Sequence, residues 1–231
     1  MATVSLILLP KLTFMLTPFA FIGALTTTII IYGLSWKNGI QPLRMILAGI
    51  AVSTLLNAFI SLILIFYPDR VSDTLGFKIG SLTAITWHEF YQLVPYTVVG
   101  FVLAIIVAEK LNVLMLGDDI AGSLGLNVEL TRLFLIILSS VLAASAVSIV
   151  GLLGFVGLIV PHIARILVGS EHRVLFAASA ILGAGLVLIC DTISRVIFAP
   201  LELPLGIVMS IIGVPFFLYL LKGGMKNARA K

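Results

Sequence analysis

Five stretches of the sequence are apolar for about as long as a lipid bilayer is thick. A hydrocarbon core of about 30 Å needs about 20 helical residues to cross it, and only helices or closed barrels satisfy their backbone groups in lipid. Of all residues, 61% are hydrophobic and 10% charged, against about a quarter charged in ordinary soluble domains. The sequence therefore predicts an all-α, polytopic transmembrane helical bundle. The five runs are residues 14–36, 45–67, 90–108, 174–194 and 203–221.

A sixth apolar stretch, residues 133–160, is too long for one comfortable crossing. Its second half carries Gly151, Gly154 and Gly157 before Pro161, and glycine permits sharp reversals and close backbone contact. We predict one helix from 133 to about 150 and a short, broken helix after it. The total is about seven spans in a single transmembrane domain covering residues 1–231.

The distribution of basic residues predicts the orientation. Loops must alternate sides, and cytoplasmic loops are enriched in Lys and Arg. With the C-terminus and its tail, residues 222–231, in the cytoplasm, ten basic residues fall inside and four outside. Seven spans then place the N-terminus outside without a signal sequence or a basic flank, so we expect the start to be incomplete.

Several function classes are disfavoured by composition. The bases are scattered between apolar runs and form no stripe that could follow nucleic acid. A single cysteine, Cys190, excludes a disulfide within the chain and a multi-thiolate metal site. No G-x-x-x-x-G-K-[ST] pattern occurs, so we expect no ATP hydrolysis, no catalytic residues and no cofactor. His162, with Arg165 three residues later, is more simply an interfacial residue than a metal ligand.

Three polar features interrupt the apolar pattern. In "LGDDIAGSLGLNV", residues 116–128, two glycines bracket a short helix whose first turn is acidic, which suits the helix dipole. Arg195 at the end of a span lies four residues after Asp191, where an ion pair can form. In the last span, Gly213 and Pro215 are expected to interrupt the helix, and such a break is tolerated where it lines a cavity.

Four segments, in their order and spacing, resemble the FecCD family, the permease subunits of bacterial ABC importers for ferric siderophores, haem and cobalamin. They are "LGDDIAGSLGLNV", "GFVGLIVPHIARILVGSEHR", "DTISR" and "ELPLGIVMSIIGVPFFLYLL". Family permeases have ten helices, of which this chain resembles the fourth to the tenth. The family's early Pro-Arg element and its "NPLA" stretch do not occur in this sequence.

The resemblance implies roles for particular residues. Residues 114–129 would form a pair of short cytoplasmic coupling helices that seat on the ATPase. Arg195 would dock the substrate-binding protein at the outer rim, and its ion pair with Asp191 would be compatible with docking. "SWKNGIQPLR", residues 35–44, resembles the inner constriction, and the last helix would border the path. The coupling residues would be Gly117, Asp118, Asp119, Ala121, Leu124 and Gly125, and the gate or pathway residues Asn38, Gly39, Gly213 and Pro215.

The expected function is translocation of a chelated iron or related compound by alternating access across the bacterial cytoplasmic (inner) membrane. The resemblance implies two ATP-binding subunits, a second permease copy as homodimer or paralogous heterodimer, and a periplasmic or lipid-anchored binding protein, all in contact with membrane lipids. One alternative is an ATP-independent secondary transporter, which needs an ionisable residue deep in a span. Apart from Asp191 near a rim, the spans offer none. The other alternative is a truncated remnant that does not transport.

Overall fold

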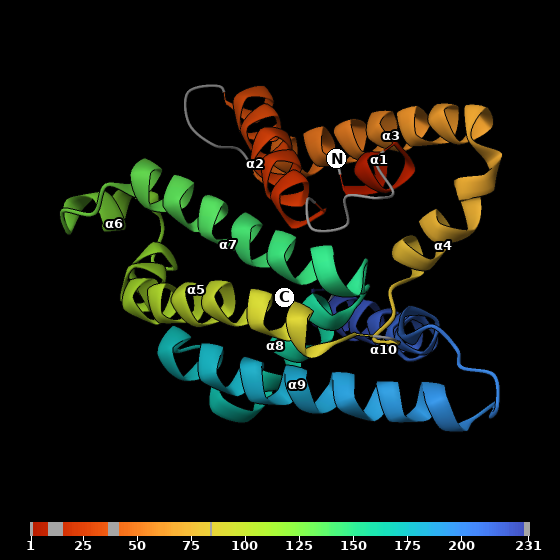
Figure 1. Cartoon of the computed structure of the whole chain (residues 1–231). Coiled ribbons are helices and arrows are strands. Elements are labelled where there is room, and N and C mark those ends of the chain that lie inside the picture. The colour runs from red at the N-terminus through yellow and green to blue at the C-terminus, as the bar shows by residue number, and fades with distance from the viewer. Residues whose placement is uncertain (1, 9–15, 37–41, 84, 229–231) are drawn as a thin grey trace. The chain divides into compact units, whose positions relative to one another are not determined.

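The computed structural model describes residues 2–8, 16–36, 42–83 and 85–228, and all regular elements in these ranges are helices (Figure 1). This confirms the predicted all-α class. The elements are α1 (Ala2–Leu8), α2 (Leu16–Ser35), α3 (Pro42–Phe66), the 3₁₀ turn η2 (Pro68–Arg70), α4 (Val71–Ile79), α5 (Trp87–Leu114), α6 (Asp118–Ser123), α7 (Val128–Val150), α8 (Val156–Val168), α9 (His172–Val196) and α10 (Leu205–Ala228).

Five helices in the described part of the chain are long and apolar enough to cross a membrane, and they belong to α2, α3, α5, α7 and α9. Four of them contain or closely match runs expected from the sequence. The fifth expected run, at the C-terminal end, forms a shorter apolar helix, Leu205–Leu220, within α10. A second short apolar helix is α8, so the predicted count of about seven combines five long helices and two short ones.

The long stretch 133–160 divides into two helices, as predicted. The first, α7, ends at Val150 and the second, α8, begins at Val156. The backbone between them takes left-handed conformations at Gly151, with φ 77°, and at Phe155, with φ 65°. Gly151 adopts this conformation at little cost, whereas a residue with a Cβ is strained there. The break therefore depends on Phe155 and, of the three expected glycines, on Gly151.

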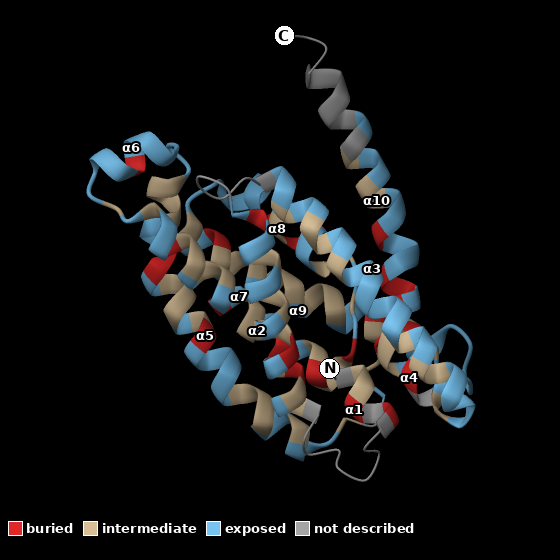
Figure 2. Ribbon diagram, turned by 90° about the horizontal axis from the view of Figure 1, so that it is seen from above, coloured by how far each residue is buried: buried red, intermediate tan, exposed pale blue. Residues whose placement is uncertain are grey.

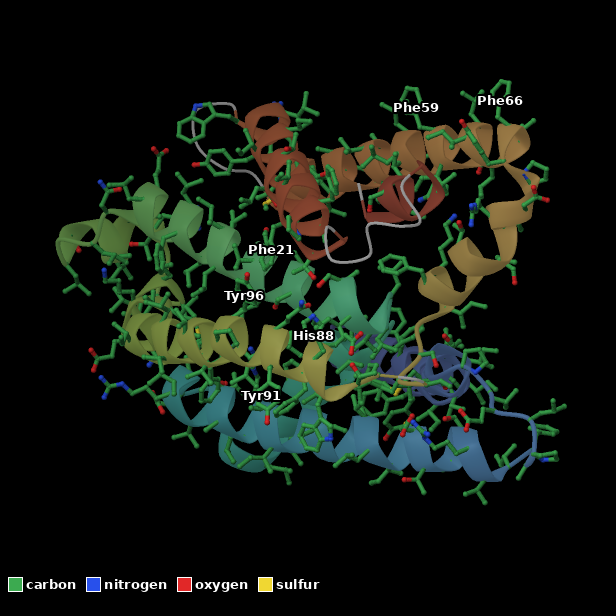
Figure 3. The ribbon with its side chains drawn as sticks, in the orientation of Figure 1. Phe21, Phe59, Phe66, His88, Tyr91 and Tyr96 are labelled. Carbon is green, nitrogen blue, oxygen red and sulfur yellow. The ribbon has the colours of Figure 1, made fainter. Side chains whose placement is uncertain are left out.

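Contacts divide the chain into two compact units, and each is described by itself. The first comprises Met1–Phe77 and Thr86–Ile149. Within it α2 packs against α3, and α1 contacts both. The Thr28 hydroxyl of α2 is hydrogen-bonded to the Ser140 hydroxyl of α7 at 2.8 Å. The rings of Phe21 in α2 and Tyr96 in α5 pack together in a tilted arrangement, with centroids 4.9 Å apart (Figure 3).

Helices α5 and α7 form an antiparallel hairpin in this first unit. A Cβ added to Gly100 of α5 would lie 2.3 Å from Leu142 Cδ2 of α7. Both residues lie about four turns from the connection between the two helices. The glycine therefore leaves room for the Leu142 side chain against α5, and small residues at helix contacts are common in membrane bundles.

Helix α3 shows how little of the apolar surface is covered within the chain. Its described side chains include none that is buried (Figure 2), and Phe59 and Phe66 are 55% and 73% exposed (Figure 3). A surface of this kind is stable only against lipid or another subunit. The pattern agrees with an integral membrane protein.

The second unit comprises Lys78–Ile85 and Val150–Lys231. Here α8 and α9 pack together, and α10 packs on both. Its core consists of Cys190 from α9 with Leu205, Val208 and Met209 from the first turns of α10. Among the positions of α10 whose burial is described, the buried ones accordingly lie in its N-terminal half (Figure 2).

The N-terminus of α10 packs directly on the backbone that follows α4. The Gly206 N–H donates to the Gly80 carbonyl at 3.2 Å, and a Cβ at Gly206 would lie 1.7 Å from the Ile79 carbonyl oxygen. No side chain fits at that distance, so the position requires glycine.

Candidate functional site

The polar connection between α5 and α7 forms the short helix α6, which lies at one end of their hairpin (Figure 1). The predicted brackets are confirmed, since Gly117 precedes the helix with φ 101° and Gly125 follows it with φ 83°. Asp118 and Asp119 occupy its first turn, as predicted. The expected pair of short helices is wrong, because α6 ends at Ser123 and residues 124–127 connect it directly to α7.

One side of α6 is buried and another is apolar and exposed. Ala121 is 0% exposed, and its carbonyl accepts the Leu126 N–H at 3.1 Å, which closes the turn after the helix. Ile120 within α6, and Leu116 and Leu124 just outside its two ends, are at least half exposed. Exposed apolar side chains outside the expected bilayer spans indicate a contact surface for another protein.

An ion pair joins α6 to the first turns of α7. Arg132 donates through Nη1 to Asp118 Oδ2 at 2.9 Å and through Nη2 to Asp118 Oδ1 at 2.6 Å. This bidentate geometry restricts the orientation of the two side chains as well as the distance between them. Asn127 supports the same region, since its Oδ1 accepts the Leu130 N–H at 3.1 Å and caps α7.

Arg132 was not among the residues predicted for this site. In the sequence, Arg132 is only a single arginine near the start of α7, the helix that follows the acidic first turn of α6. Asp118 and Arg132 are 14 residues apart, and no helical or strand period connects positions at that separation across a turn. Only the folded connection brings them together.

A second candidate site lies at the C-terminal end of α9. Arg195 Nε donates to Asp191 Oδ2 at 2.8 Å, which closes the i,i+4 pair. The Arg195 side chain nevertheless keeps 43% of its surface exposed, so part of it is available to another molecule. Nearby in the same unit, the Thr83 hydroxyl donates to Glu202 Oε2 at 3.0 Å before α10 begins.

The expected interruption of the last helix is wrong. Helix α10 continues through Gly213 and Pro215, with the proline inside it. A proline removes one backbone hydrogen bond, which a membrane helix tolerates when its surroundings compensate. Gly213 serves packing, because a Cβ there would lie 2.4 Å from Cγ of the Phe155 ring.

The remaining expected pathway residues, Asn38 and Gly39, lie outside the described residues. Among the residues that the structure describes, no group of three or more His, Cys, Asp or Glu side chains could hold a metal ion. His162 is exposed, and its ring lies edge-on to Phe216 with centroids 6.3 Å apart. The two candidate sites, around α6 and at Arg195, therefore present exposed side chains that another molecule could contact.

Comparison with protein families matches residues 1–223 to the FecCD transport family. The iron(3+)-hydroxamate import system permease protein FhuG of Bacillus subtilis is 39% identical over 213 residues, which are 90% of this chain and 62% of that protein. The cobalamin import system permease protein BtuC of Halobacterium salinarum is 39% identical, covering 89% of this chain and 55% of its own. The hemin transport system permease protein HmuU of Yersinia pestis is 37% identical, with 87% and 61% covered.

A solved structure of an inward-facing metal-chelate type ABC transporter is similar in fold. The TM-score is 0.87 at 26% identity, and the match covers 96% of this chain and 72% of that one. The chain spans between 55% and 62% of the length of the three relatives named above.

Proposed function

The chain belongs to the FecCD transport family, and from this membership we propose that it is the transmembrane permease subunit of a binding-protein-dependent ABC importer. It would translocate a chelated iron or related compound by alternating access, powered by a separate ATPase. The proposal rests mainly on the structure around α6. This short helix has exposed apolar side chains in it and beside it, and a bidentate ion pair holds it to α7.

The coupling role is assigned to Gly117, Asp118, Asp119, Ala121, Leu124 and Gly125. Helix α6 is connected to α5 through one glycine and to α7 through another, while the ion pair from Asp118 to Arg132 resists rotation against α7. A partner that binds the exposed side chains of Leu116, Ile120 and Leu124 would therefore move both long helices of the hairpin. A flexible loop would dissipate such a displacement.

The outer contact is assigned to Arg195. The i,i+4 pair with Asp191 holds the guanidinium at the helix end while leaving it partly exposed. An exposed arginine can still accept a second carboxylate, because its fork carries five N–H donors. The binding protein would supply that carboxylate. Asn38, Gly39, Gly213 and Pro215 are proposed to border the translocation path.

The assembly would contain two ATP-binding subunits, two permease copies, either identical or paralogous, and a periplasmic or lipid-anchored binding protein. The unburied apolar length of α3 supports cover by lipid and by the second copy. We propose residues 1–231 as a single permease domain in the bacterial cytoplasmic membrane with the C-terminus inside. The relatives import iron hydroxamate, cobalamin and hemin, which favours a chelate over a free ion as cargo.

Co-purification tests the central claim. The tagged full chain is expressed with an ABC importer ATPase, and Leu124→Glu is compared with Leu201→Glu. Both leucines are exposed, 64% and 73%, but Leu201 lies between α9 and α10. Burying one leucine contributes about 1.5–3 kcal/mol, so we expect Leu124→Glu to reduce ATPase recovery by about tenfold or more.

The control Leu201→Glu is expected to recover ATPase as the parent does. Equal recovery with both variants contradicts the assignment of α6. Uptake that requires a proton or sodium gradient and no ATPase would support secondary transport instead.

A further inference from the structure

The ends of α5 and α7 that carry α6 enclose an open groove with a volume of about 690 Å³. It lies wholly within the first compact unit. One wall is α5, the other is α7, and the turn after α6 closes one end. The residues on which the argument depends are Val107, Lys110, Asn127, Leu130, Phe134 and Ile137.

The α7 wall is an apolar strip that runs along the helix. Leu130, Phe134 and Ile137 follow one another at spacings of four and three residues, which places them on one face. At 1.5 Å per residue the strip is about 10 Å long. Their exposed fractions are 63%, 42% and 37%. Because α7 is long and apolar enough to cross a membrane, the strip would run from the membrane surface toward the bilayer interior.

The basic side chain of Lys110 lies at the end of the groove nearest α6. Lys110 is exposed, and Val107, one turn away on the same face of α5, continues the apolar lining. Helix α5 has 28 residues, so it is about 42 Å long and extends beyond a hydrocarbon core of about 30 Å. Lys110 lies in the last turns of α5, so in a bilayer of that thickness it would fall near the headgroups. Asn127 adds a polar amide at the same end.

We propose that this groove binds an anionic phospholipid, with an acyl chain against Leu130, Phe134 and Ile137 and the phosphate beside Lys110. The apolar strip favours lipid over a soluble partner, because it continues about two turns into the bilayer, where a soluble protein does not reach. The lysine supplies the charge that selects an anionic headgroup, since a basic residue near such a surface attracts it.

The bound lipid would also touch the turn that ends α6, because Gly125 and Asn127 line the groove. It would thereby support the position of α6 from the side opposite to solvent. This consequence for coupling rests on the proposed function, whereas lipid binding itself does not.

Quenching of a tryptophan in the groove tests the proposal. The full chain carries tryptophan only at positions 36 and 87, so Trp36→Phe and Trp87→Phe provide a silent background for Phe134→Trp. The protein is reconstituted in nanodiscs of unlabelled phosphatidylcholine that contain a minor fraction of either brominated phosphatidylglycerol or brominated phosphatidylcholine. A single lysine near an anionic lipid predicts a roughly fivefold preference for phosphatidylglycerol.

Lys110→Met keeps the apolar stem and removes the charge, and it is expected to abolish the preference. Lys110→Arg keeps the charge and is expected to retain it. Lys222→Met, a charge-matched change on exposed Lys222 of α10 outside the groove, is also expected to retain it. Added inorganic phosphate should not relieve the quenching, because it lacks the acyl chain.

Three results would overturn the proposal. They are equal quenching by both brominated lipids, equal loss of preference in Lys110→Met and Lys222→Met, and relief of quenching by inorganic phosphate. The measurement contains neither ATPase nor cargo, so its failure would leave the proposed transport function untouched.

Discussion

The ion pair between Asp118 and Arg132 makes a quantitative prediction about α6. The two side chains keep 53% and 30% of their surface exposed, so water screens much of the attraction. Exposed pairs contribute about 0.2–1 kcal/mol, and a bidentate, charge-assisted geometry places this one at the upper end. We therefore expect a coupling energy of about 1 kcal/mol, which corresponds to a roughly fivefold change in the local opening equilibrium of α6.

Hydrogen exchange of the full chain in nanodiscs measures this opening. Asp118→Ala and Arg132→Ala should each accelerate exchange of the α6 amides, and the double variant should be no faster than the more affected single variant. The double-mutant cycle is needed because Asp118→Ala also removes a favourable charge at the helix N-terminus. Amides in the middle of α9 should not change.

Asp119→Ala provides the matched control. Asp119 is the neighbouring acid of the same helical turn and is also exposed, but the bidentate partner of Arg132 is Asp118. Asp119→Ala and Arg132→Ala should therefore be additive. A coupling energy below about 0.2 kcal/mol between Asp118 and Arg132 would refute the claim that the pair holds α6 in place, because the pair would then contribute less than a typical exposed surface ion pair.

Three further variants follow from backbone geometry and exposure. Gly206→Ala should destabilise the second unit by about 3 kcal/mol or more, because its Cβ would overlap the Ile79 carbonyl. Thermal unfolding measures this loss, and the control Gly185→Ala, whose added Cβ meets nothing within 4 Å, should be near neutral. A similar loss of stability in both variants would count against the predicted overlap. Gly125→Val forces a branched residue into φ 83° at a cost of about 1–3 kcal/mol, so ATP hydrolysis should continue while uptake falls, and wild-type uptake would remove the coupling assignment. Arg195→Glu should weaken docking of the binding protein in a pull-down and leave ATPase association intact, whereas unchanged docking would exclude that role.

Local features of the site were predictable because they depend on residues close in sequence. The short helix between Gly117 and Gly125 follows from two positions that tolerate positive φ and from acids that suit a helix start. The pair between Asp191 and Arg195 follows from the helical period, which brings positions four apart onto one face.

The interpretation of Gly213 and Pro215 was wrong for a related reason. Residue type alone suggests a break, but whether a helix breaks there depends on what surrounds it. In the fold, Gly213 accommodates the Phe155 ring and the helix continues past Pro215. The sequence offered no means to pair Gly213 with Phe155, which caps the start of α8.

Apolar runs in the sequence are enough to predict which helices are long and apolar enough to cross a membrane, because bilayer thickness and backbone hydrogen bonding set the length and composition that a span needs. Contacts between residues far apart in the sequence, such as Asp118 with Arg132 and Gly206 with Ile79, are visible only in the folded chain. A span suits lipid through its own composition, whereas contacts between helices depend on close packing of particular shapes. That packing is a property of pairs of surfaces and cannot be read from either surface alone.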